Sequence, residues 1–400
     1  MLSLSNLDVV ETLRLFKSAN LPVSFLVPTK TGIEKSIMDA TKEVRDLLLS
    51  SGIHDFEKQQ QGTDSKVLIP TKFVSKDKII ETQTSLYRPE TKSGDPRIWV
   101  YKLGENTDPS DLLAIVPQKK ELTVVNCSKS EMSALLNPTG NIFKDLFSTS
   151  VVGLSSTASE LLSKLKLVGN KGFVNTLRPG DTGVGFTLET LLGIPANSSK
   201  APDFKGIEIK SGRKRAHKSG RIQLFSQVPN WSISRLKGSK EILYARGKFN
   251  EKKQRTQLFH EFSAIKTNSY DMRLELENSQ ELLHQIYVGV EPYEKDVTWE
   301  MSLLKSRLVE KHKETFWVKA ETIGKSGDEN EQFQYSSVKH TSQVDPVAFP
   351  ILLKTGIITL DYTIKELKPG TAKDQGYLFK ISPNNLDLLF SSVNQYSLTS

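Results

Sequence analysis

The chain has 400 residues, of which 37% are hydrophobic and 25% are charged, and these values are ordinary for a globular protein. Its one cysteine, Cys127, excludes a disulfide framework or a cysteine-based zinc site within the chain, and it fits a reducing compartment. No apolar run approaches the roughly 18 residues that cross a bilayer. The N-terminus also lacks the pattern of a signal peptide. We therefore expect a cytoplasmic protein with no membrane partner.

The net charge of +8 is concentrated in one part of the chain. Residues 201–255 contain 15 basic and 4 acidic side chains. Such a cluster is typical of a surface that binds a polyanion. A lysine-rich surface that only faces solvent is the alternative interpretation.

Residues 1–147 are predicted to form a smaller α+β domain. The sequence Thr31-Gly32-Ile33-Glu34 has the pattern of a capping box, and the helix that it opens would end at Gly52. Alternating apolar runs predict strands over 66–69, 79–87, 97–103 and 113–116. The segment 85–103 mixes basic and aromatic side chains, so it is either a DNA-reading surface or a set of strand ends over a core. The small, serine-rich residues 148–158 are the expected linker, with a helix over 159–168.

Residues 155–400 are predicted to form the second domain. A loop with glycines at 180, 183 and 185 leads into a short helix, Phe186–Leu192, which carries Glu189 and ends at Gly193. A longer loop then reaches Pro202-Asp203. The next residues, Ile207-Glu208-Ile209-Lys210, alternate apolar and polar side chains. A strand here would place Glu208 and Lys210 on one face and the two isoleucines on the other.

The residues Asp203, Glu208 and Lys210 form a D-x4-E-x-K motif. Asp203, Glu208 and the backbone carbonyl of Ile209 offer the oxygen ligands that Mg²⁺ prefers. Lys210 would orient or deprotonate an attacking water and stabilise a phosphate. This arrangement belongs to the PD…(D/E)xK pattern of metal-dependent nucleases. An amphipathic edge strand preceded by a turn at Asp203 is the structural alternative.

The same spacing occurs a second time, at Asp361, Glu366 and Lys368. This copy has no preceding proline, no internal glycine and no neighbouring basic cluster. We therefore interpret it as a solvated strand end.

The stretch from Leu177 to Arg213, together with Leu-Phe-Ser-Gln-Val-Pro-Asn-Trp at 224–231, resembles the MvaI/BcnI family of type II restriction endonucleases. That family is related to the mismatch-repair nicking enzyme MutH, and the resemblance covers about residues 155–400. Glu189, Asp203, Glu208 and Lys210 match the catalytic set of the family. The resemblance implies an α/β restriction-endonuclease-like domain with a central mixed sheet, acting as a monomer on double-stranded DNA. It further implies Mg²⁺-dependent cleavage of both strands at a short site, with a cognate DNA methyltransferase encoded nearby.

The resemblance and the basic cluster also suggest which residues contact DNA. The expected phosphate contacts are Arg213, Lys214, Arg215, Lys218 and Arg221. The candidates for reading bases are Arg178, Asp181, Lys373, Asp374, Gln375 and Lys380. Gln375 and Lys380 depart from the family's usual histidine and arginine.

Three functions stay open from the sequence. The first is a restriction enzyme, the second is a MutH-like nuclease that nicks one strand, and the third is a DNA-binding module without catalysis. Some members of the family carry a B3-like DNA-recognition domain ahead of the nuclease. By analogy alone, residues 1–147 are expected to be a DNA-recognition or effector domain.

Overall fold

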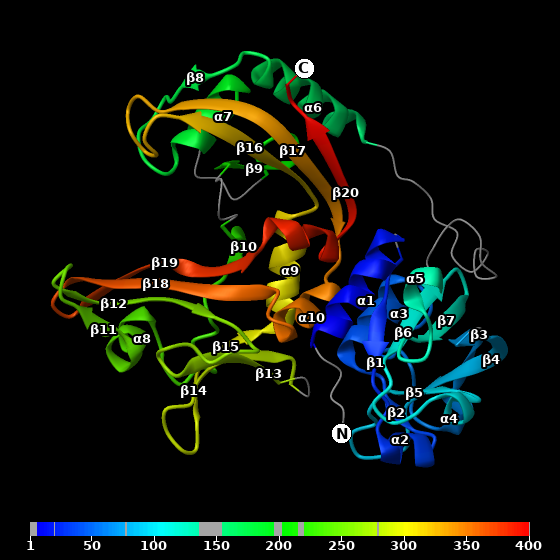
Figure 1. Ribbon diagram of the computed structural model, residues 1–400. Coiled ribbons are helices and arrows are strands. Elements are labelled where there is room, and N and C mark those ends of the chain that lie inside the picture. The colour runs from blue at the N-terminus through cyan, green and yellow to red at the C-terminus, as the bar shows by residue number, and fades with distance from the viewer. Residues whose placement is uncertain are drawn as a thin grey trace. The chain divides into compact units, whose positions relative to one another are not determined.

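The computed structural model describes residues 6–19, 21–76, 78–135, 154–195, 202–214, 220–277 and 280–399. The chain divides into two compact units, shown in Figure 1. The first unit comprises residues 1–150, 276–282 and 347–355, and the second comprises 151–275, 283–346 and 356–400. The first unit therefore contains two short segments from late in the chain. No helix among the described residues is both long and apolar enough to cross a membrane.

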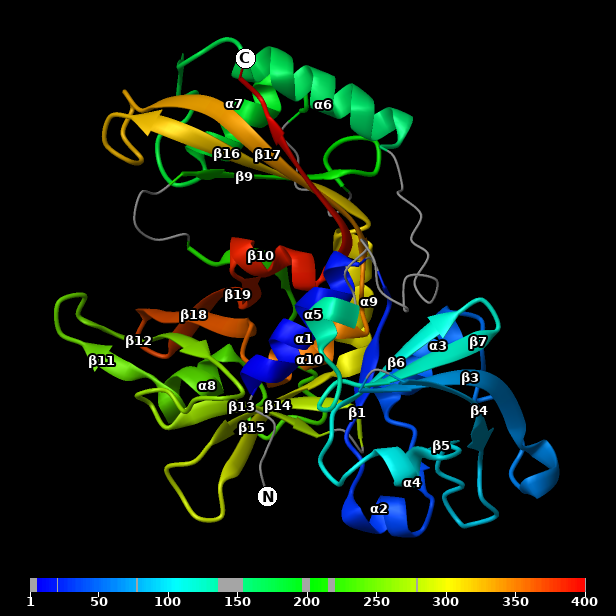
Figure 2. The ribbon, with the colours of Figure 1, turned by 45° about the vertical axis from the view of Figure 1, so that its right-hand side comes forward.

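The first unit is built around a seven-stranded sheet in the order β1-β6-β7-β3-β4-β5-β2 (Figure 2). Strands β3 and β7 pair in parallel, and the other neighbours are antiparallel. The strands are β1 Ser24–Leu26, β2 Met38–Asp39, β3 Val67–Ser75, β4 Lys78–Tyr87, β5 Arg97–Val100, β6 Leu113–Gln118 and β7 Glu121–Asn126. The helices are α1 Asn6–Ser18, α2 Lys30–Glu34, α3 Lys42–Ser50, α4 Leu103–Asn106, α5 Met132–Leu135 and α10 Ala348–Lys354, with the 3₁₀ turn η1 Thr63–Ser65.

The capping box predicted at Thr31 is wrong. Two separate helices replace the single predicted one: Thr29 caps α2 by accepting a hydrogen bond from the Gly32 N–H, and Thr41 caps α3. Between them, Met38 pairs with Ile98 of β5 as part of the sheet. The apolar spacing fits a continuous helix, but tertiary pairing with β5 interrupts it.

The predicted strands of the first unit are present, with different ends. The fourth extends to Gln118, and β7, which was not predicted, follows it through a tight turn in which Lys119 has a φ of 52°. The core lies between this sheet and α3, whose Val44, Leu47 and Leu48 are buried among sheet side chains. In the segment 85–103, Arg88 donates hydrogen bonds to the carbonyls of Gly94, Phe56 and Gln59. Arg88 therefore stabilises the loops around it by these contacts.

The second unit contains three sheets. One has the order β20-β17-β16-β9, with β8 also pairing β17; the others are β10-β19-β18-β12-β11 and β13-β14-β15. The strands are β8 Val174–Asn175, β9 Glu208–Arg213, β10 Ile222–Ser226, β11 Lys248–Asn250, β12 Arg255–Phe262, β13 Met272–Glu277, β14 Leu282–Tyr287, β15 Glu294–Glu300, β16 Glu314–Ile323, β17 Gln332–Val344, β18 Ile358–Lys368, β19 Thr371–Ile381 and β20 Phe390–Ser397. The helices are α6 Ser156–Gly169, α7 Gly183–Leu191, α8 Ser239–Arg246 and α9 Met301–Lys311, with η3 Pro383–Leu388 as a 3₁₀ helix. The predicted mixed α/β class is confirmed, because β9 and β16 run parallel while β16 and β17 run antiparallel.

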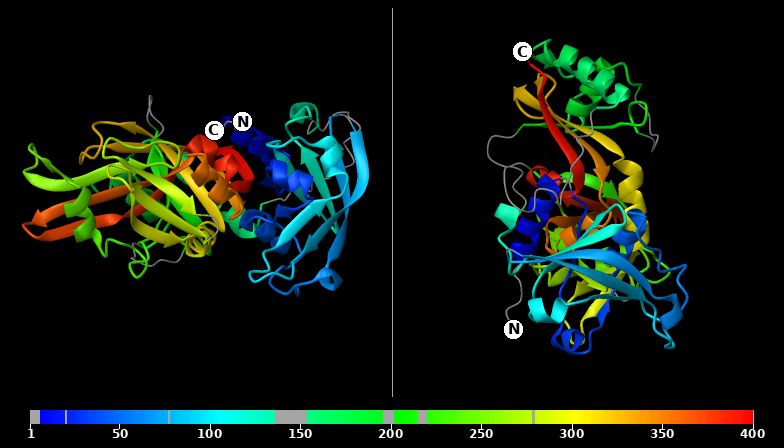
Figure 3. Two further views of the ribbon diagram at one scale, coloured as in Figure 1. Left: turned by 90° about the horizontal axis from the view of Figure 1, so that it is seen from below. Right: turned by 90° about the vertical axis from the view of Figure 1, so that its right-hand side faces the viewer.

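Helices α6 and α7 cover one face of the β9–β16–β17 sheet (Figures 1 and 2, and the right-hand view of Figure 3). Their leucines pack against Ile207, Ile209 and Phe316 in one buried cluster. Burial of each such side chain contributes about 2 kcal/mol. Helix α6 begins at Ser156 with Ser155 as its cap, so the expected linker 148–158 extends too far toward the C-terminus. The isoleucine face of β9 is therefore fixed in the core, and its other face is left for Glu208 and Lys210.

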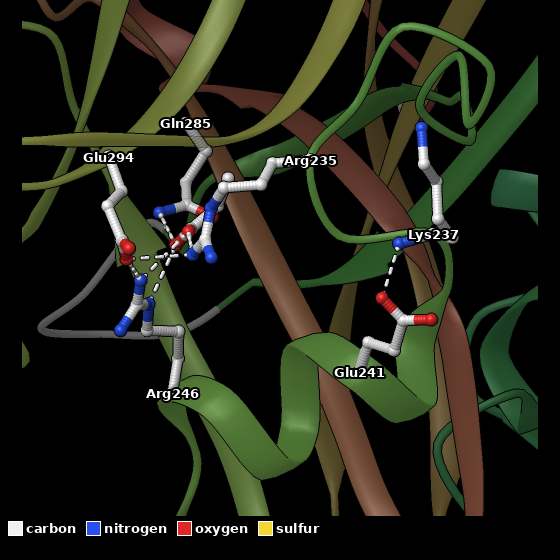
Figure 4. Close-up of polar contacts among 7 residues, drawn as sticks. Arg235, Lys237, Glu241, Arg246, Gln285 and Glu294 are labelled. Atoms are coloured by element: carbon white, nitrogen blue, oxygen red, sulfur yellow. Dashed lines mark hydrogen bonds and ion pairs between the residues drawn. The ribbon is translucent and has the colours of Figure 1, made fainter.

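A cluster of charged side chains ties α8 to the small sheet (Figure 4). The Asp296 side chain on β15 is fully buried, and its carboxylate accepts hydrogen bonds from Arg235, Arg246 and Gln285. Glu294 contacts the same two arginines but is about one third exposed. The Arg246 guanidinium also lies 3.7 Å from the centroid of the Tyr287 ring. Asp296 is therefore the anion at the buried centre of this cluster.

Replacing Asp296 with asparagine should destabilise the fold by about 3–5 kcal/mol, because it removes the fully buried carboxylate from Arg235 and Arg246 and leaves only the more exposed Glu294 to pair with them. Glu294→Gln is the matched control, and it should change the free energy of unfolding by less than about 1 kcal/mol because Glu294 is more exposed. Urea unfolding of both variants measures the difference. Equal midpoints for Asp296→Asn and Glu294→Gln would show that burial does not set the strength of this cluster.

Candidate active site

A tight turn brings Asp203 beside β9. Phe204 and Ile207 exchange two backbone hydrogen bonds, and the intervening Lys205 and Gly206 have φ values of 47° and 92°. Two positive φ values are characteristic of the type I′ turn, and glycine adopts them without strain. The chain thereby folds back so that Asp203 Oδ2 accepts a hydrogen bond of 2.8 Å from the Ile209 N–H. The turn thus explains why four residues separate Asp203 from Glu208 in the motif.

The backbone of Ile209 faces the same side as Asp203. Strand β9 is the last strand in its sheet and pairs with β16 on one side. Within a strand, the N–H and C=O of one residue point to the same side. Because the Ile209 N–H bonds Asp203 rather than β16, its carbonyl also points toward the Asp203 side. This placement suits the carbonyl as a third oxygen ligand beside the two carboxylates.

Glu208 is the buried centre of the candidate site. Its side chain is 1% exposed, and its Oε1 lies 2.6 Å from Lys210 Nζ and 2.8 Å from Lys311 Nζ. Its Oε2 is buried and has no hydrogen-bond partner in the described structure. An unpartnered buried carboxylate oxygen is costly. A cation at this oxygen would relieve that cost.

Glu189 projects from α7 toward the same place. Burial raises the pKa of Glu189, and the charges of Asp203 and Glu208 raise it further, whereas Lys210 lowers it. Burial likewise raises the pKa of Asp203, against the hydrogen bond from Ile209, and Glu208 adds to the increase. All four residues predicted as catalytic are therefore close enough to act on one another. Their three carboxylates repel each other, and a nearby divalent cation would reduce that repulsion.

The residues present fit a hard cation such as Mg²⁺. Asp203, Glu208 and the Ile209 carbonyl supply oxygen atoms, and such ions usually keep several waters or substrate phosphate oxygens as further ligands. Among the described residues, no group of three or more histidine, cysteine or acidic side chains is gathered tightly enough to enclose a metal. A metal bound here would therefore take part of its shell from water or substrate.

Two residues near the site were missed in the sequence. Lys311 ends α9 and reaches Glu208 from outside the motif. The next residue, His312, bridges Thr315 Oγ1 and the Leu224 carbonyl, and burial lowers its pKa to about 4. No spacing in the sequence links Lys311 to Glu208, because 102 residues separate them.

Arg213, a predicted phosphate contact, is engaged within the protein. Its guanidinium forms a two-pronged ion pair with Glu331, with Nε–Oε1 and Nη2–Oε2 distances of 2.6 and 2.7 Å. It also donates to the carbonyls of Gly180 and Asp181. Lys214 pairs with Glu321 at the surface. Arg213 therefore fixes the loop that carries Arg178 and Asp181.

Arg221 and Lys380 both bind Asp361, the first acid of the second D-x4-E-x-K copy. Arg221 Nη1 lies 2.8 Å from Asp361 Oδ1, and Lys380 Nζ lies 2.7 Å from Oδ2. The Asp361 side chain is only 14% exposed, so this end of the copy is not the solvated strand end that we predicted. In that copy, Glu366 accepts a hydrogen bond from Tyr244. The three residues of the copy are distributed along β18 without a turn of the kind that precedes β9.

The remaining candidate readers differ in their surroundings. Arg178 is exposed, and its guanidinium stacks 3.9 Å from the Phe186 ring centroid. Lys373 and Gln375 are exposed on β19, whereas Asp374 accepts hydrogen bonds from Ser239 and the Gly376 N–H. Asp181 is exposed as well. Arg215 and Lys218 lie outside the described residues.

Comparison with known proteins agrees with this fold. The model of the MvaI/BcnI restriction endonuclease family matches residues 162–390, and the chain belongs to this family. A solved structure described as the complex of restriction endonuclease MvaI with its cognate DNA substrate covers 62% of this chain and 100% of its own, with 22% identity and a TM-score of 0.50. A structure of MvaI in the absence of DNA covers 61% of this chain and 99% of its own, with 23% identity and a TM-score of 0.37. No curated protein matches the chain. Family membership implies a deoxyribonuclease, and the region ahead of residue 162 is additional to the matched part.

Proposed function

We propose that this protein is a Mg²⁺-dependent endonuclease that hydrolyses duplex DNA at one short sequence, with Glu189, Asp203, Glu208 and Lys210 as its catalytic residues. The observation that carries the proposal is the buried Glu208 carboxylate, which has one oxygen between two lysines and the other without a partner. Asp203, Glu208 and the Ile209 carbonyl would hold the ion. When bound, Mg²⁺ would stabilise the charge of the transition state and lower the pKa of a water.

The side chains of the site would then perform distinct tasks. Lys210, 39% exposed and anchored on Glu208, presents its ammonium group to the phosphate and orients the attacking water. Glu189, whose pKa burial raises, is suited to exchange a proton with that water. The water oxygen bonds to phosphorus, the bond from phosphorus to the 3′ oxygen breaks, and that oxygen takes up a proton. The products are 5′-phosphate and 3′-hydroxyl ends.

The direct test is digestion of unmethylated phage DNA by the purified protein, with and without Mg²⁺, beside the Lys210→Ala variant. Discrete fragments that require both Mg²⁺ and Lys210 are expected, and sequencing of their ends would give the recognition site. Nicked circles alone would favour a MutH-like enzyme that cuts one strand. Retained DNA binding without any cleavage would favour a module that binds DNA without catalysis.

We also propose a setting for this activity. A restriction enzyme acts in the cytoplasm on double-stranded DNA, and a cognate methyltransferase encoded nearby would protect the host site. The monomer expected from the resemblance is checked by sedimentation of the protein with and without DNA. Residues 1–147 are proposed to be an additional DNA-recognition or effector domain, and 155–400 the nuclease. Deletion of 1–147 would test whether site choice depends on that domain.

Lys311 should weaken the binding of a divalent cation, because its ammonium group contacts a proposed metal ligand. The Lys311→Met variant is expected to bind Mn²⁺ severalfold more tightly than the wild type, since one competing positive charge is removed from Glu208. Titration of free Mn²⁺ by electron paramagnetic resonance, without DNA, measures this directly. Lys313→Met removes the same charge two residues away at an exposed position and should leave the affinity unchanged. If Lys311→Met and Lys313→Met bind Mn²⁺ with equal affinity, Lys311 does not influence the metal site.

A further inference from the structure

A pocket of about 490 Å³ opens beside Lys210 on the polar face of the β9–β16–β17 sheet. Strands β9, β16, β17 and β20 form one wall, and η3 and β10 complete it. Its charged lining residues are three lysines, Lys210, Lys319 and Lys339, with no acidic residue among them. The remaining polar lining includes the amides of Gln223, Asn384 and Gln395. The pocket is therefore cationic and adjoins the proposed catalytic lysine.

Strand register places the three lysines on the same face. Lys210 of β9 is opposite Trp317 of β16, which is in turn opposite Lys339 of β17. Lys319, two residues beyond Trp317, is opposite Gly212. A Cβ atom at Gly212 would lie 4.0 Å from Lys319 Nζ, so the Lys319 ammonium group lies beside β9 at Gly212. Neighbouring strands are about 4.8 Å apart, which puts the three ammonium groups within reach of adjacent groups of one ligand.

The charges of these lysines are not equally compensated. Lys210 is paired with Glu208, whereas Lys339 donates to the neutral carbonyl of Pro383 at 3.2 Å. No ion pair with a described carboxylate engages Lys319 or Lys339. Burial lowers the pKa of Lys319, and the nearby charge of Lys339 lowers it further. Two partly buried cations side by side are unfavourable unless an anion joins them.

We infer that Lys319 and Lys339 form a phosphate-binding subsite for the DNA strand being cut, where they hold backbone phosphate next to the one that Lys210 contacts. The inference deepens the proposed function, since it assumes DNA as the ligand. Ammonium groups act as point charges toward phosphate oxygens, and such contacts position the backbone without reading bases. Lys319 and Lys339 thus act as positioning residues that fix the scissile bond over Glu208 and Lys210.

The test is the salt dependence of DNA binding by the Lys319→Met/Lys339→Met variant, which retains the aliphatic bulk of both side chains. Affinity for a fluorescent duplex is measured between low and moderate salt in Ca²⁺, and unfolding curves check that the variant is folded. The slope of log affinity against log salt should become shallower by about 0.9 for each phosphate that the variant no longer neutralises. The matched control, Lys166→Met/Lys171→Met, removes the same charge at exposed positions on and just after α6 and should keep the wild-type slope. If the slope of Lys319→Met/Lys339→Met equals that of the wild type or of the control variant, the inference is overturned.

A second experiment identifies the source of the phosphate. In a duplex that carries the mapped cleavage site, a neutral methylphosphonate replaces the single phosphate next to the scissile one. The wild type should bind this duplex more weakly, whereas the double variant should show no further weakening, because the two changes remove the same interaction. Independent, additive decreases in affinity would overturn the assignment to that phosphate. Inorganic phosphate that binds through Lys319 and Lys339 while the DNA slope stays unchanged would also overturn it.

These outcomes separate the subsite from the proposed catalysis. Wild-type cleavage with an unchanged slope in the double variant would reject the subsite alone. A shallower slope in the double variant without cleavage by the wild type would support the subsite and reject the endonuclease.

Discussion

Replacing Asp203 with alanine should slow DNA cleavage by on the order of 10³-fold or more, because the change removes a proposed metal ligand from the transition state. DNA affinity should change little, since no phosphate contact is assigned to a carboxylate. The Ile209 N–H would lose its acceptor, which costs about 1 kcal/mol of folding free energy. Single-turnover cleavage and binding in Ca²⁺ separate the two effects. An Asp203→Ala enzyme that cuts at the wild-type rate would disprove the site assignment.

The second D-x4-E-x-K copy supplies a matched control for this site. Lys368 occupies the position in that copy that Lys210 occupies in the first, and it is exposed at the end of β18. Lys368→Ala should cut DNA like the wild type, whereas Lys210→Ala should lose cleavage as Asp203→Ala does. If Lys368→Ala loses cleavage and Lys210→Ala keeps it, the active site lies on β18 instead of β9.

Replacing Arg213 with methionine should destabilise the protein by about 3–5 kcal/mol at neutral pH, because it leaves the Glu331 carboxylate buried without its partner. The Glu331 side chain is 1% exposed and that of Arg213 is 9% exposed. Lys214→Met breaks a pair whose lysine is 61% exposed and should cost less than about 1 kcal/mol. Urea unfolding measures both variants. Weaker DNA binding with unchanged stability would instead return Arg213 to the predicted phosphate contacts.

Lowering the pH should reduce the difference in unfolding free energy between the wild type and Arg213→Met. The ion pair with Arg213 lowers the pKa of Glu331 below its ordinary value of 4.5. A carboxyl whose pKa is lower in the folded state contributes its full stability above the unfolded pKa, and loses it as the pH falls through the folded pKa. The free-energy gap between the wild type and Arg213→Met should therefore be greatest near neutral pH and narrow below about pH 4.5. A gap that stays constant on acidification would show that Glu331 does not carry the effect.

The structure gives Arg213 a role different from the one its position in the basic cluster suggested. It connects the loop at Gly180 and Asp181 with Glu331, and Glu331 in turn accepts a hydrogen bond from the Gly327 N–H. Arg221 and Lys380 are similarly bound to Asp361. A basic cluster in the sequence indicates where positive charge is abundant. Which of its members remain free for phosphate depends on acids elsewhere in the chain, such as Glu331 for Arg213 and Asp361 for Arg221.

Much of the candidate site was predictable because its parts are local. The D-x4-E-x-K spacing reflects a four-residue segment that turns tightly and a strand of period two, so residues 203–210 determine their own arrangement. The helix that carries Glu189 and its end near Gly193 also follow from neighbouring residues, but it begins at Gly183, three residues before the predicted start at Phe186. The family and the mixed α/β class predicted for this part of the chain are confirmed. The roles of Glu189, Asp203, Glu208 and Lys210 remain predictions.

The sequence by itself determined the turn, the strand and the placement of Glu208 and Lys210 on one face, because short-range backbone geometry and alternation set them. Only the tertiary structure decided that Lys311 contacts Glu208, that Arg213 pairs with Glu331, and that Lys319 and Lys339 lie beside Lys210. It also decided that Met38 joins β5 and divides the predicted helix of the first unit. These outcomes depend on strand pairing and charge contacts between segments far apart in the chain, and the energies of such contacts have no signature in local spacing.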